Sequence, residues 1–434
     1  MVVLLEKLMH KNSEESKDTG LSSLLSRVKG KNTSSEQEKA IRLLSEAGLP
    51  SRRVENWKYT DLRWFNQHQF VKPVPVNTQQ VQEWLEKNVF PLPNLSELPR
   101  LIIANGQIIK EFSTLFDDSN CQIDIKDGVY GSLGRPQKDI MTTLNYAIGQ
   151  QTLQLTISKG QQAGTILFVY LGYGQDDGLV SFHHRLNVEL QDHAQLSVIE
   201  MNAGCGEYFT NPVCEIKVGP RANFEYNKLL NSSLESYNCA NLYVSLADHA
   251  TYRQFLISKG SKFSRQEVYI DINGEWSNAS FQAVQKLADR QHADITTVFS
   301  HLVPHCQSDQ NVKNILTDQS HGVFQGKVFV HQKAQKTNAQ QQNQALLLSD
   351  QAEINTKPEL EIYADDVKCS HGATVGALDE DQLFFLMARG IPFHQARDIL
   401  INAFVAQAVE DVNDPIAKQL LKEQLGVEVV EDIT

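Results

Sequence analysis

The sequence is poor in cysteine, and the few cysteines it has lie far apart. Its 434 residues contain six, at positions 121, 205, 214, 239, 306 and 369, and no two of them form a Cys-x-x-Cys pair. Small secreted domains held by disulfides carry a denser set in a shorter chain, so the spacing argues against that class and predicts reduced thiols. Most of these thiols are expected to be small buried side chains.

Long apolar runs and a basic balance of charge are also missing. The longest apolar run, Thr165–Leu171, is far shorter than the ~20 residues that a membrane-spanning helix needs. The opening Met1–Met9 does not resemble a signal peptide, so the sequence predicts a cytoplasmic protein without a membrane span. The formal net charge of −12 argues against general nucleic-acid binding, because phosphate neutralisation needs a basic face.

Nucleotide-binding motifs are absent as well. No GxxxxGK[ST] string occurs, and Gly172-Tyr-Gly174 supplies only the first three positions of GxGxxG. If ATP drives the function of this protein, another subunit is expected to hydrolyse it. No flavin or nicotinamide site can be argued from these motifs.

What is present begins with a helical N-terminal domain, expected over residues 1 to about 95. Ser35 and Glu38 form a capping-box pattern, and Gly48 is expected to end the helix that follows. An aromatic cluster then occupies residues 57–65, interleaved with basic residues. In an acidic chain, packing between domains is the favoured interpretation of this cluster over stacking on nucleic acid.

A repeat of β-strand character dominates the middle of the chain. From about residue 180, Ala194, Ala222 and Ala250 each follow a turn signal and precede an alternating strand, at a constant spacing of 28 residues. Weaker echoes occur at residues 279, 293, 322 and 352. A fixed period of this kind predicts a solenoid, and strand-rich units without helical pattern favour a parallel β-helix over a sandwich. The β-helix core is expected over residues 96–376, with a mixed lead-in to about 180.

A C-terminal helical domain is expected over residues 377–434. Asp379 can cap a helix through the residue three positions on, and Gly390–Pro392 should break that helix. A second helix then follows, with one apolar face predicted from helical spacing and formed by Ala396, Ile399, Leu400, Ala403 and Phe404. Phe384 and Phe385 are adjacent and cannot share one narrow apolar stripe. One interpretation is that one of them packs on the β-helix while the other faces outward; the alternative is a helix that is covered on all sides.

The candidate site is the stretch Asp365–Gly376 at the end of the repeats. Cys369 and His371 are two residues apart, so both side chains should project from one face of a strand. Thiolate and imidazole are ligand types for iron, zinc and iron–sulfur clusters. Two ligands do not complete a metal shell, and the remainder must come from elsewhere in the fold or from a second protein. The alternative is a buried cysteine beside a structural histidine.

Other candidates are weaker. His305–Cys306, the pair Cys205 and Cys214, and His183–His184 are each better explained as structural than as metal-binding. The amide-rich segment Asn338–Gln344 predicts a stacked ladder of amides. An enzymatic alternative, a carbohydrate-active β-helix, would use Asp365–Asp366 or Asp379–Asp381, but adjacent acids diverge on a strand and the second group suits a helix N-terminus.

Several long motifs resemble the SufB/SufD family, which assembles iron–sulfur clusters. Within that family the string Ser370–Gly376 has the SufD form rather than the SufB form. The resemblance covers nearly the whole chain and is carried by Leu49–Thr60, Arg265 ahead of Gly274, Ala334–Thr337, Asn343–Leu348, Lys357–Gly376 and Asp381–Pro392.

This resemblance implies a mainly β fold, a right-handed parallel β-helix flanked by helical domains. It implies a non-catalytic scaffold subunit that pairs with a SufB-like paralogue through the β-helix and takes part in iron acquisition. A SufC-like ATPase is expected to dock on the C-terminal helices, at or near Phe385, Arg389 and Pro392. His371, with Cys369 beside it, is expected to contact a transient iron–sulfur cluster shared with the partner.

Two further expectations follow from the resemblance. Flavin is associated only with the assembled complex of the family, and no motif in this chain locates a site for it. A homodimer is possible when the SufB-like partner is absent, since the same edge could pair with itself.

Overall fold

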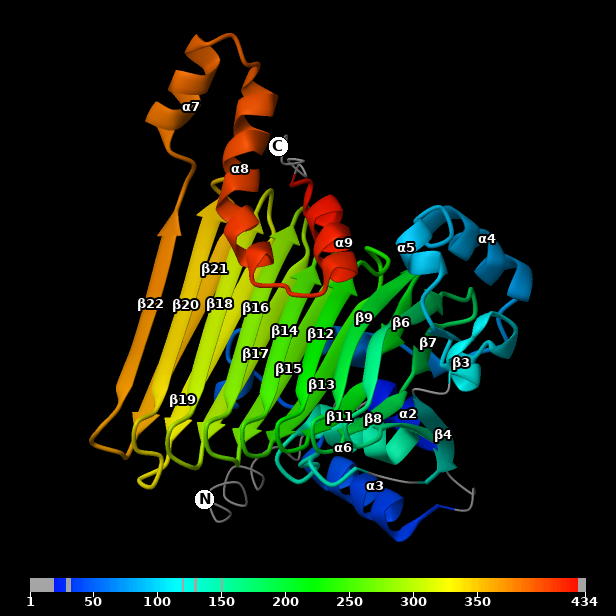
Figure 1. Cartoon of the computed structure of the whole chain (residues 1–434). Helices are drawn as coiled ribbons and strands as arrows, with labels where there is room; N and C mark the ends of the chain where they lie inside the picture. The colour runs from blue at the N-terminus through cyan, green and yellow to red at the C-terminus, as the bar shows by residue number, and fades with distance from the viewer. Residues whose placement is uncertain (1–18, 29–32, 119–120, 129–130, 150, 428–434) are drawn as a thin grey trace.

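The structure is a computed structural model that describes residues 19–28, 33–118, 121–128, 131–149 and 151–427. Two sheets face one another, and the chain alternates between them as it winds from one end of the molecule to the other (Figure 1). The solenoid makes about eight turns, so the parallel β-helix predicted from the 28-residue period is confirmed. The N-terminal apolar stretch Met1–Met9 lies outside the described residues.

The first sheet contains the strands that open each turn. In spatial order its main path is β21 (Glu353–Ile362), β19 (His321–Val330), β17 (His292–His301), β15 (Phe263–Ile272), β13 (Tyr237–Leu246), β11 (Val213–Val218), β8 (Arg185–Leu190), β5 (Gln151–Ile157) and β4 (Gln122–Asp127). Beside this path lie β1 (Phe70–Val71), β7 (Leu179–Phe182) and β10 (Tyr208–Thr210).

The second sheet contains the strands that close each turn. Its order is β22 (Lys368–Gly376), β20 (Asn338–Leu347), β18 (Gln307–Leu316), β16 (Asn278–Leu287), β14 (Thr251–Ser258), β12 (Asn223–Leu230), β9 (Gln195–Cys205), β6 (Gln162–Tyr173), β2 (Arg100–Ala104) and β3 (Gln107–Ile108). Because β5 and β6 already pair in parallel with β8 and β9, the winding begins at residue 151, before the repeat is visible in the sequence.

The alanine repeat marks one corner of the solenoid. Backbone carbonyls of Ala194 and Ala222 accept hydrogen bonds from the next turn, and this column continues through Ala250, Ser277, Cys306 and Thr337. The prediction that Ala279 continues this column is therefore wrong. Ala279 pairs with Tyr252, and both lie two positions beyond the column members of their turns, Ser277 and Ala250. The half-period echo at 293 and 322 is real, since Ala293 pairs with Gly322 in the first sheet.

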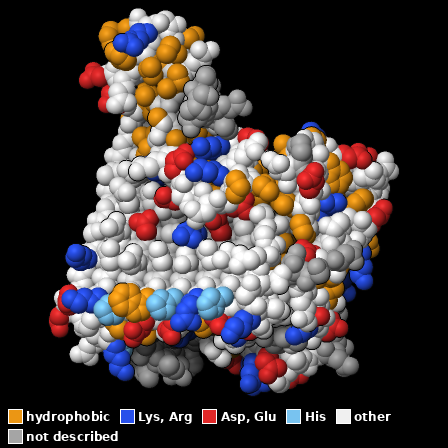
Figure 2. Space-filling model, viewed as in Figure 1, with side chains coloured by type: hydrophobic (Ala, Val, Ile, Leu, Met, Phe, Trp, Pro, Cys, Tyr) orange, Lys and Arg blue, Asp and Glu red, His pale blue; other side chains and the backbone are white. Residues whose placement is uncertain are grey.

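The residue before each column member has a left-handed backbone. These corner residues are His193, Arg221, His249, Trp276, His305 and Lys336, with φ between 55° and 63°. Histidine and cationic side chains gather along the lower edge of the face in Figure 2. The turn signals of the sequence therefore correspond to one strained corner position repeated along the solenoid.

The N-terminal helices are divided between the two sheets. They are α2 (Thr19–Ser26), α3 (Ser35–Ala47), α4 (Thr78–Asn88), α5 (Pro93–Ser96) and α6 (Ile140–Ile148), with the short 3-10 turns η1 (Glu55–Trp57), η2 (Arg63–Gln67), η3 (Lys110–Phe112) and η4 (Leu115–Asp117). Helices α2, α3 and α6 pack with strands of the first sheet, whereas α4 and α5 pack with β2 and β6 of the second sheet. The cap of α3 is Ser34, whose hydroxyl accepts the Gln37 N–H at 3.2 Å, one residue before the predicted Ser35. Gly48 ends α3 as predicted.

The aromatic cluster 57–65 packs against strands of the first sheet. Trp64 stacks on Tyr237 with ring centroids 3.9 Å apart, and Phe65 is fully buried. The Arg265 guanidinium lies 4.1 Å from the centroid of the Trp57 ring, so β15 holds the N-terminal segment directly. The predicted packing role of the cluster is confirmed.

The C-terminal helices cover part of the second sheet and also extend beyond it. They are α7 (Glu380–Ala388), α8 (Phe393–Glu410) and α9 (Pro415–Leu425). In Figure 1, α7 and the start of α8 form a hairpin that projects past the ends of the strands, while the rest of α8 and α9 lie against the sheet. The carboxylate of Asp379 accepts the Gln382 N–H at 3.0 Å, which confirms the predicted cap.

The predicted apolar face of α8 was partly wrong. Ala396 is buried, but Ile399 is 45% exposed and Ala403 is exposed. The face that packs on the solenoid is instead formed by Ile401, Val405, Ala408 and Val409. Both apolar faces have helical spacing, and only contact with the second sheet distinguishes them.

Among the described residues, none of the helices is both long and apolar enough to cross a membrane.

Candidate functional site

Cys369 and His371 lie on β22, the last strand of the solenoid. β22 pairs with β20 on one side, and its other side forms the edge of the second sheet. Cys369 is in register with Ala339 and His371 with Gln341, and both of these β20 residues are buried in the interior. The two candidate ligands therefore occupy inward-facing positions on one face of β22, yet His371 is exposed because it belongs to the terminal turn.

Cys369 has a partly apolar environment. It packs beside a small cluster that contains Val328, Val330 and Ala339. Desolvation raises the pKa of the Cys369 thiol, although the backbone N–H of Ala339 opposes this effect. In the isolated chain the thiol is consequently favoured over the thiolate, and a cation or metal would be needed to deprotonate it.

The described residues do not complete a metal shell around this pair. Within them, no group of three or more His, Cys, Asp or Glu side chains is arranged to hold a metal ion. Of the nearby acids, Asp366 forms an ion pair with Lys336 and Asp379 caps α7. Cys369 and His371 thus offer two donors at an open end of the fold.

The pair His305–Cys306 does not form a second ligand set. The Cys306 thiol is fully buried and donates to the backbone oxygen of Gly274 at 3.2 Å. The His305 ring stacks on Trp276, with centroids 4.3 Å apart. The left-handed backbone of His305 directs its ring onto Trp276, while the Cys306 thiol points into the interior. These contacts favour a structural role for both residues over a metal site.

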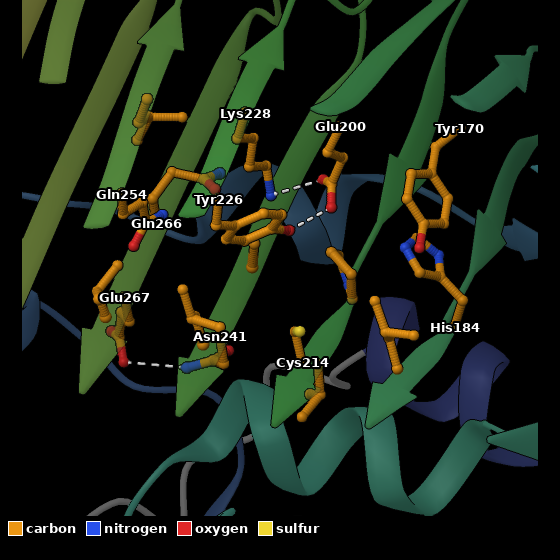
Figure 3. A pocket seen from close by; sticks show the side chains of 17 residues that line it. Tyr170, His184, Glu200, Cys214, Tyr226, Lys228, Asn241, Gln254, Gln266 and Glu267 are labelled. Carbon is orange, nitrogen blue, oxygen red and sulfur yellow. Dashed lines mark hydrogen bonds and ion pairs between the residues drawn. The ribbon is translucent and has the colours of Figure 1, made fainter. Parts of the chain in front are cut away.

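The interior of the early turns contains a charged cavity that was not anticipated from the sequence. Its volume is about 30 Å³, enough for about one water molecule. In Figure 3, Lys228 and Tyr226 both point to the Glu200 carboxylate; Lys228 Nζ lies 3.1 Å from it, and the Tyr226 hydroxyl donates to it. These three side chains face the interior from the neighbouring strands β9 and β12. Polar residues at the inward-facing positions of a strand, which alternate with outward-facing ones, were the sequence signal that could have indicated this cavity.

Two weak sequence candidates line this cavity. Desolvation and the Glu200 carboxylate raise the pKa of the Cys214 thiol. Burial lowers the pKa of His184 to about 4, and its ring stacks on Tyr170 with centroids 4.3 Å apart. A protonated thiol and a neutral imidazole beside a satisfied ion pair indicate a polar core rather than a reactive centre. Cys205, by contrast, is exposed at the end of β9.

The projecting hairpin of α7 and α8 exposes a large apolar surface. Phe384 is 73% exposed and Phe385 is 53% exposed, so the prediction that one of them packs on the β-helix is wrong. Three more large apolar side chains are exposed on this hairpin, those of Met387, Phe393 and Ile399. Figure 2 shows apolar side chains concentrated at this projection. Surfaces of this kind are typical of docking sites.

Arg389 and Pro392 lie at the turn of the same hairpin. The Arg389 guanidinium is 4.0 Å from the centroid of the Phe385 ring, a cation–π geometry. Pro392 caps the start of α8. A shallow hollow between the two helices is lined by Asp381, Gln382, Phe385, Leu386, Ile399 and Leu400.

Comparison with known proteins agrees with this architecture. Residues 173–404 match the family described as "SUF system FeS cluster assembly, SufBD core domain". The chain belongs to the SufB/SufD family. It is 30% identical to the iron–sulfur cluster assembly protein SufD of Escherichia coli, over 92% of this chain and 94% of that protein. It is 26% identical to SufD of Bacillus subtilis, over 68% of each chain.

A further relative extends the comparison beyond proteins named SufD. An iron–sulfur cluster assembly SufBD family protein of Synechocystis is 30% identical over 86% of both chains. The SufD-type identification made from the C-terminal motif is confirmed, and this SufB/SufD member has a role in iron–sulfur cluster assembly.

Proposed function

We propose that this chain is the SufD-type half of a two-chain scaffold on which an iron–sulfur cluster is assembled. His371, with Cys369, would contact the nascent cluster, and a SufB-type partner would supply the remaining ligands. The supporting observation is the position of His371: it faces the interior of the solenoid but is exposed on the terminal turn. A site completed by two chains would hold its cluster transiently, as a donor must, and would contribute to iron acquisition only when assembled.

The open end of the solenoid supports pairing with another β-helix. β21 and β22 are the terminal strands of their sheets, and unpaired strand edges favour addition of further strands. The same edge could join two copies of this chain, so a homodimer competes with the heterodimer in the absence of the partner.

The hairpin of α7 and α8 would dock a SufC-type ATPase. Closure of two ATPase subunits could then move the two hairpins of the scaffold and strain the site between the solenoids. Phe385, Arg389 and Pro392 would lie at this contact. Flavin would enter only in the assembled complex, and the cytoplasm is the proposed compartment, in keeping with the free thiols of all six cysteines.

Co-expression of the tagged chain with SufB-type and SufC-type proteins tests the assembly. A stable complex containing all three, identified by its mass, is expected. His371→Ala should leave this complex intact and reduce its iron and sulfide content, whereas Ser370→Ala, on the outward face of β22, should not. Equal cluster content in both variants would contradict the role of His371.

The ATPase contact has its own test. Phe385→Asp should abolish binding of the SufC-type subunit without changing the circular dichroism spectrum, because it places a charge in the apolar surface. Leu234→Asp is a matched control, since Leu234 is 57% exposed and lies far from the hairpin in the sequence. Unchanged binding by the Phe385 variant would reject the docking surface.

A further inference from the structure

His371 is the last member of an inward-facing column that runs along the second sheet. It is in register with Gln341 on β20, and Gln341 is in register with Gln310 on β18. Neighbouring strands lie ~4.8 Å apart, so side chains of one column are next to each other. Gln341 is 2% exposed and Gln310 is fully buried. A buried amide therefore lies directly behind the candidate iron ligand.

The amides of this column have a defined direction. The Thr297 hydroxyl donates to Oε1 of Gln310 at 2.6 Å, and Nε2 of Gln341 donates to the same oxygen at 3.4 Å. The N–H side of Gln341 thus faces β18. Its carbonyl oxygen Oε1 is buried and has no hydrogen-bond partner among the described residues. A buried carbonyl without a donor is unfavourable, so this orphaned acceptor calls for a partner.

The opposite sheet leaves space for this amide. Gly326 on β19 is an inward position, and a Cβ there would lie 1.9 Å from Nε2 of Gln341. Any larger residue at 326 would displace the amide from the interior. Both sheets therefore contribute to holding the Gln341 side chain beneath the terminal turn.

Cys369 has no comparable support. Its neighbour in register is Ala339, a fully buried residue with no polar side-chain atom. Of the two candidate ligands, only His371 has a polar side chain behind it on the preceding turn.

We propose that Gln341 is a positioning residue for His371. Its Oε1 accepts the N–H of one imidazole nitrogen and thereby fixes the tautomer and the plane of the ring. The lone pair of the other nitrogen is then directed out of the solenoid, toward iron. Histidine ligands commonly donate their second N–H to a carbonyl or carboxylate in this way. The functional meaning of this contact rests on the proposed role of His371, but the contact itself does not.

The tautomer of His371 can be measured directly on the full-length chain without its partners. Two-bond 15N–1H correlation spectra of 15N-histidine-labelled protein, recorded above the ordinary titration range of histidine and assigned with His371→Ala, should show one tautomer for His371. Gln341→Met keeps the length of the side chain but lacks a strong acceptor, so both tautomers are expected. Gln341→Glu retains an acceptor and should restore one. Gln340→Met, on the outward face of β20, is the matched control.

A second measurement uses the assembled complex with the SufB-type and SufC-type subunits. Its affinity for iron alone should fall about 10- to 100-fold in Gln341→Met, as is usual when the outer hydrogen bond of a ligand is lost. Binding of the partner subunits should not change, which separates this effect from a general structural one.

The outcomes distinguish the two proposals. A wild-type spectrum with both tautomers overturns the positioning inference, whether or not the Gln341 variants fold. An unchanged single tautomer in folded Gln341→Met overturns it as well. A tautomer shift in Gln341→Met together with normal cluster content in His371→Ala would retain the contact and reject His371 as the cluster ligand.

Discussion

Replacing Arg265 should detach the N-terminal segment from the solenoid. Arg265 on β15 is 1% exposed; its Nε donates to Glu267 at 2.6 Å, and it forms a second ion pair with Asp294. It also donates to the backbone oxygen of Asn56 at 2.9 Å and covers the Trp57 ring. One cation thus neutralises two buried carboxylates and attaches residues from a distant part of the sequence.

The expected fall in the free energy of unfolding follows from the two buried carboxylates that Arg265→Met would leave without a cation. Removing one partner of a buried ion pair costs about 3–5 kcal/mol, because the remaining charge stays buried without compensation. Loss of the cation–π contact with Trp57 contributes up to about 2 kcal/mol, and the two effects overlap. We therefore expect the free energy of unfolding to fall by about 3–5 kcal/mol, a large part of the 5–15 kcal/mol of a typical domain.

The loss should depend on pH. Burial by itself would raise the pKa of Glu267, but Arg265 and the hydrogen bonds to the carboxylate hold it below the ordinary value. Without Arg265 the burial effect dominates, so Glu267 binds a proton in the folded variant more readily. The variant should therefore be least stable relative to wild type at alkaline pH, and the difference should shrink as the pH falls.

Urea unfolding at two pH values, with limited proteolysis of residues 51–67, measures both effects. Arg290→Met is the control: Arg290 is exposed and donates to Gln319 at 2.9 Å, so its replacement should change stability by no more than about 0.5 kcal/mol. We expect the free energy of unfolding of Arg265→Met to fall by ~3–5 kcal/mol. A fall that differs from that of the control by no more than about 1 kcal/mol would refute the role of Arg265.

Two further predictions concern acid stability. Burial lowers the pKa of His301 to about 4, so the unfolded chain binds a proton that the folded chain excludes. His301 should therefore contribute a fall in stability of up to about 1.4 kcal/mol per pH unit below pH ~6.5, in addition to the falls caused by the buried His183, His184 and His292. His301→Gln should reduce the total slope by that contribution in urea unfolding between pH 7 and 5. Hydrogen bonds from Lys418 and Lys422 lower the pKa of Glu410 to about 2, so the link between α8 and α9 should hold above pH ~4.5 and weaken as the pH falls toward 2. Because Glu410 is exposed, Glu410→Gln should cost less than about 1 kcal/mol at neutral pH. Protection factors of the α9 amides, which are corrected for the intrinsic exchange rate at each pH, should fall with pH in wild type and stay constant in this variant; an equal fall in both would contradict the assignment.

The sequence alone determined that the chain forms a solenoid and that the two candidate ligands lie on the same face of a strand. A constant interval between Ala194, Ala222 and Ala250 implies equal turns, and equal turns can only stack in register. The spacing of Cys369 and His371 is likewise sufficient to place them on one face of a strand, because side chains alternate. Local signals also identified the cap at Asp379 and the helix break at Gly390, since both depend on a few neighbouring residues.

Only the tertiary structure decided what each of these positions contacts. Later turns change length, so the alanine column passes to Ser277, Cys306 and Thr337, which no fixed period could predict. The buried face of α8 and the exposure of both phenylalanines of α7 depend on where the helices leave the second sheet. Gln341 lies behind His371 because strands 30 residues apart pair in register, a contact between turns that a linear pattern does not contain.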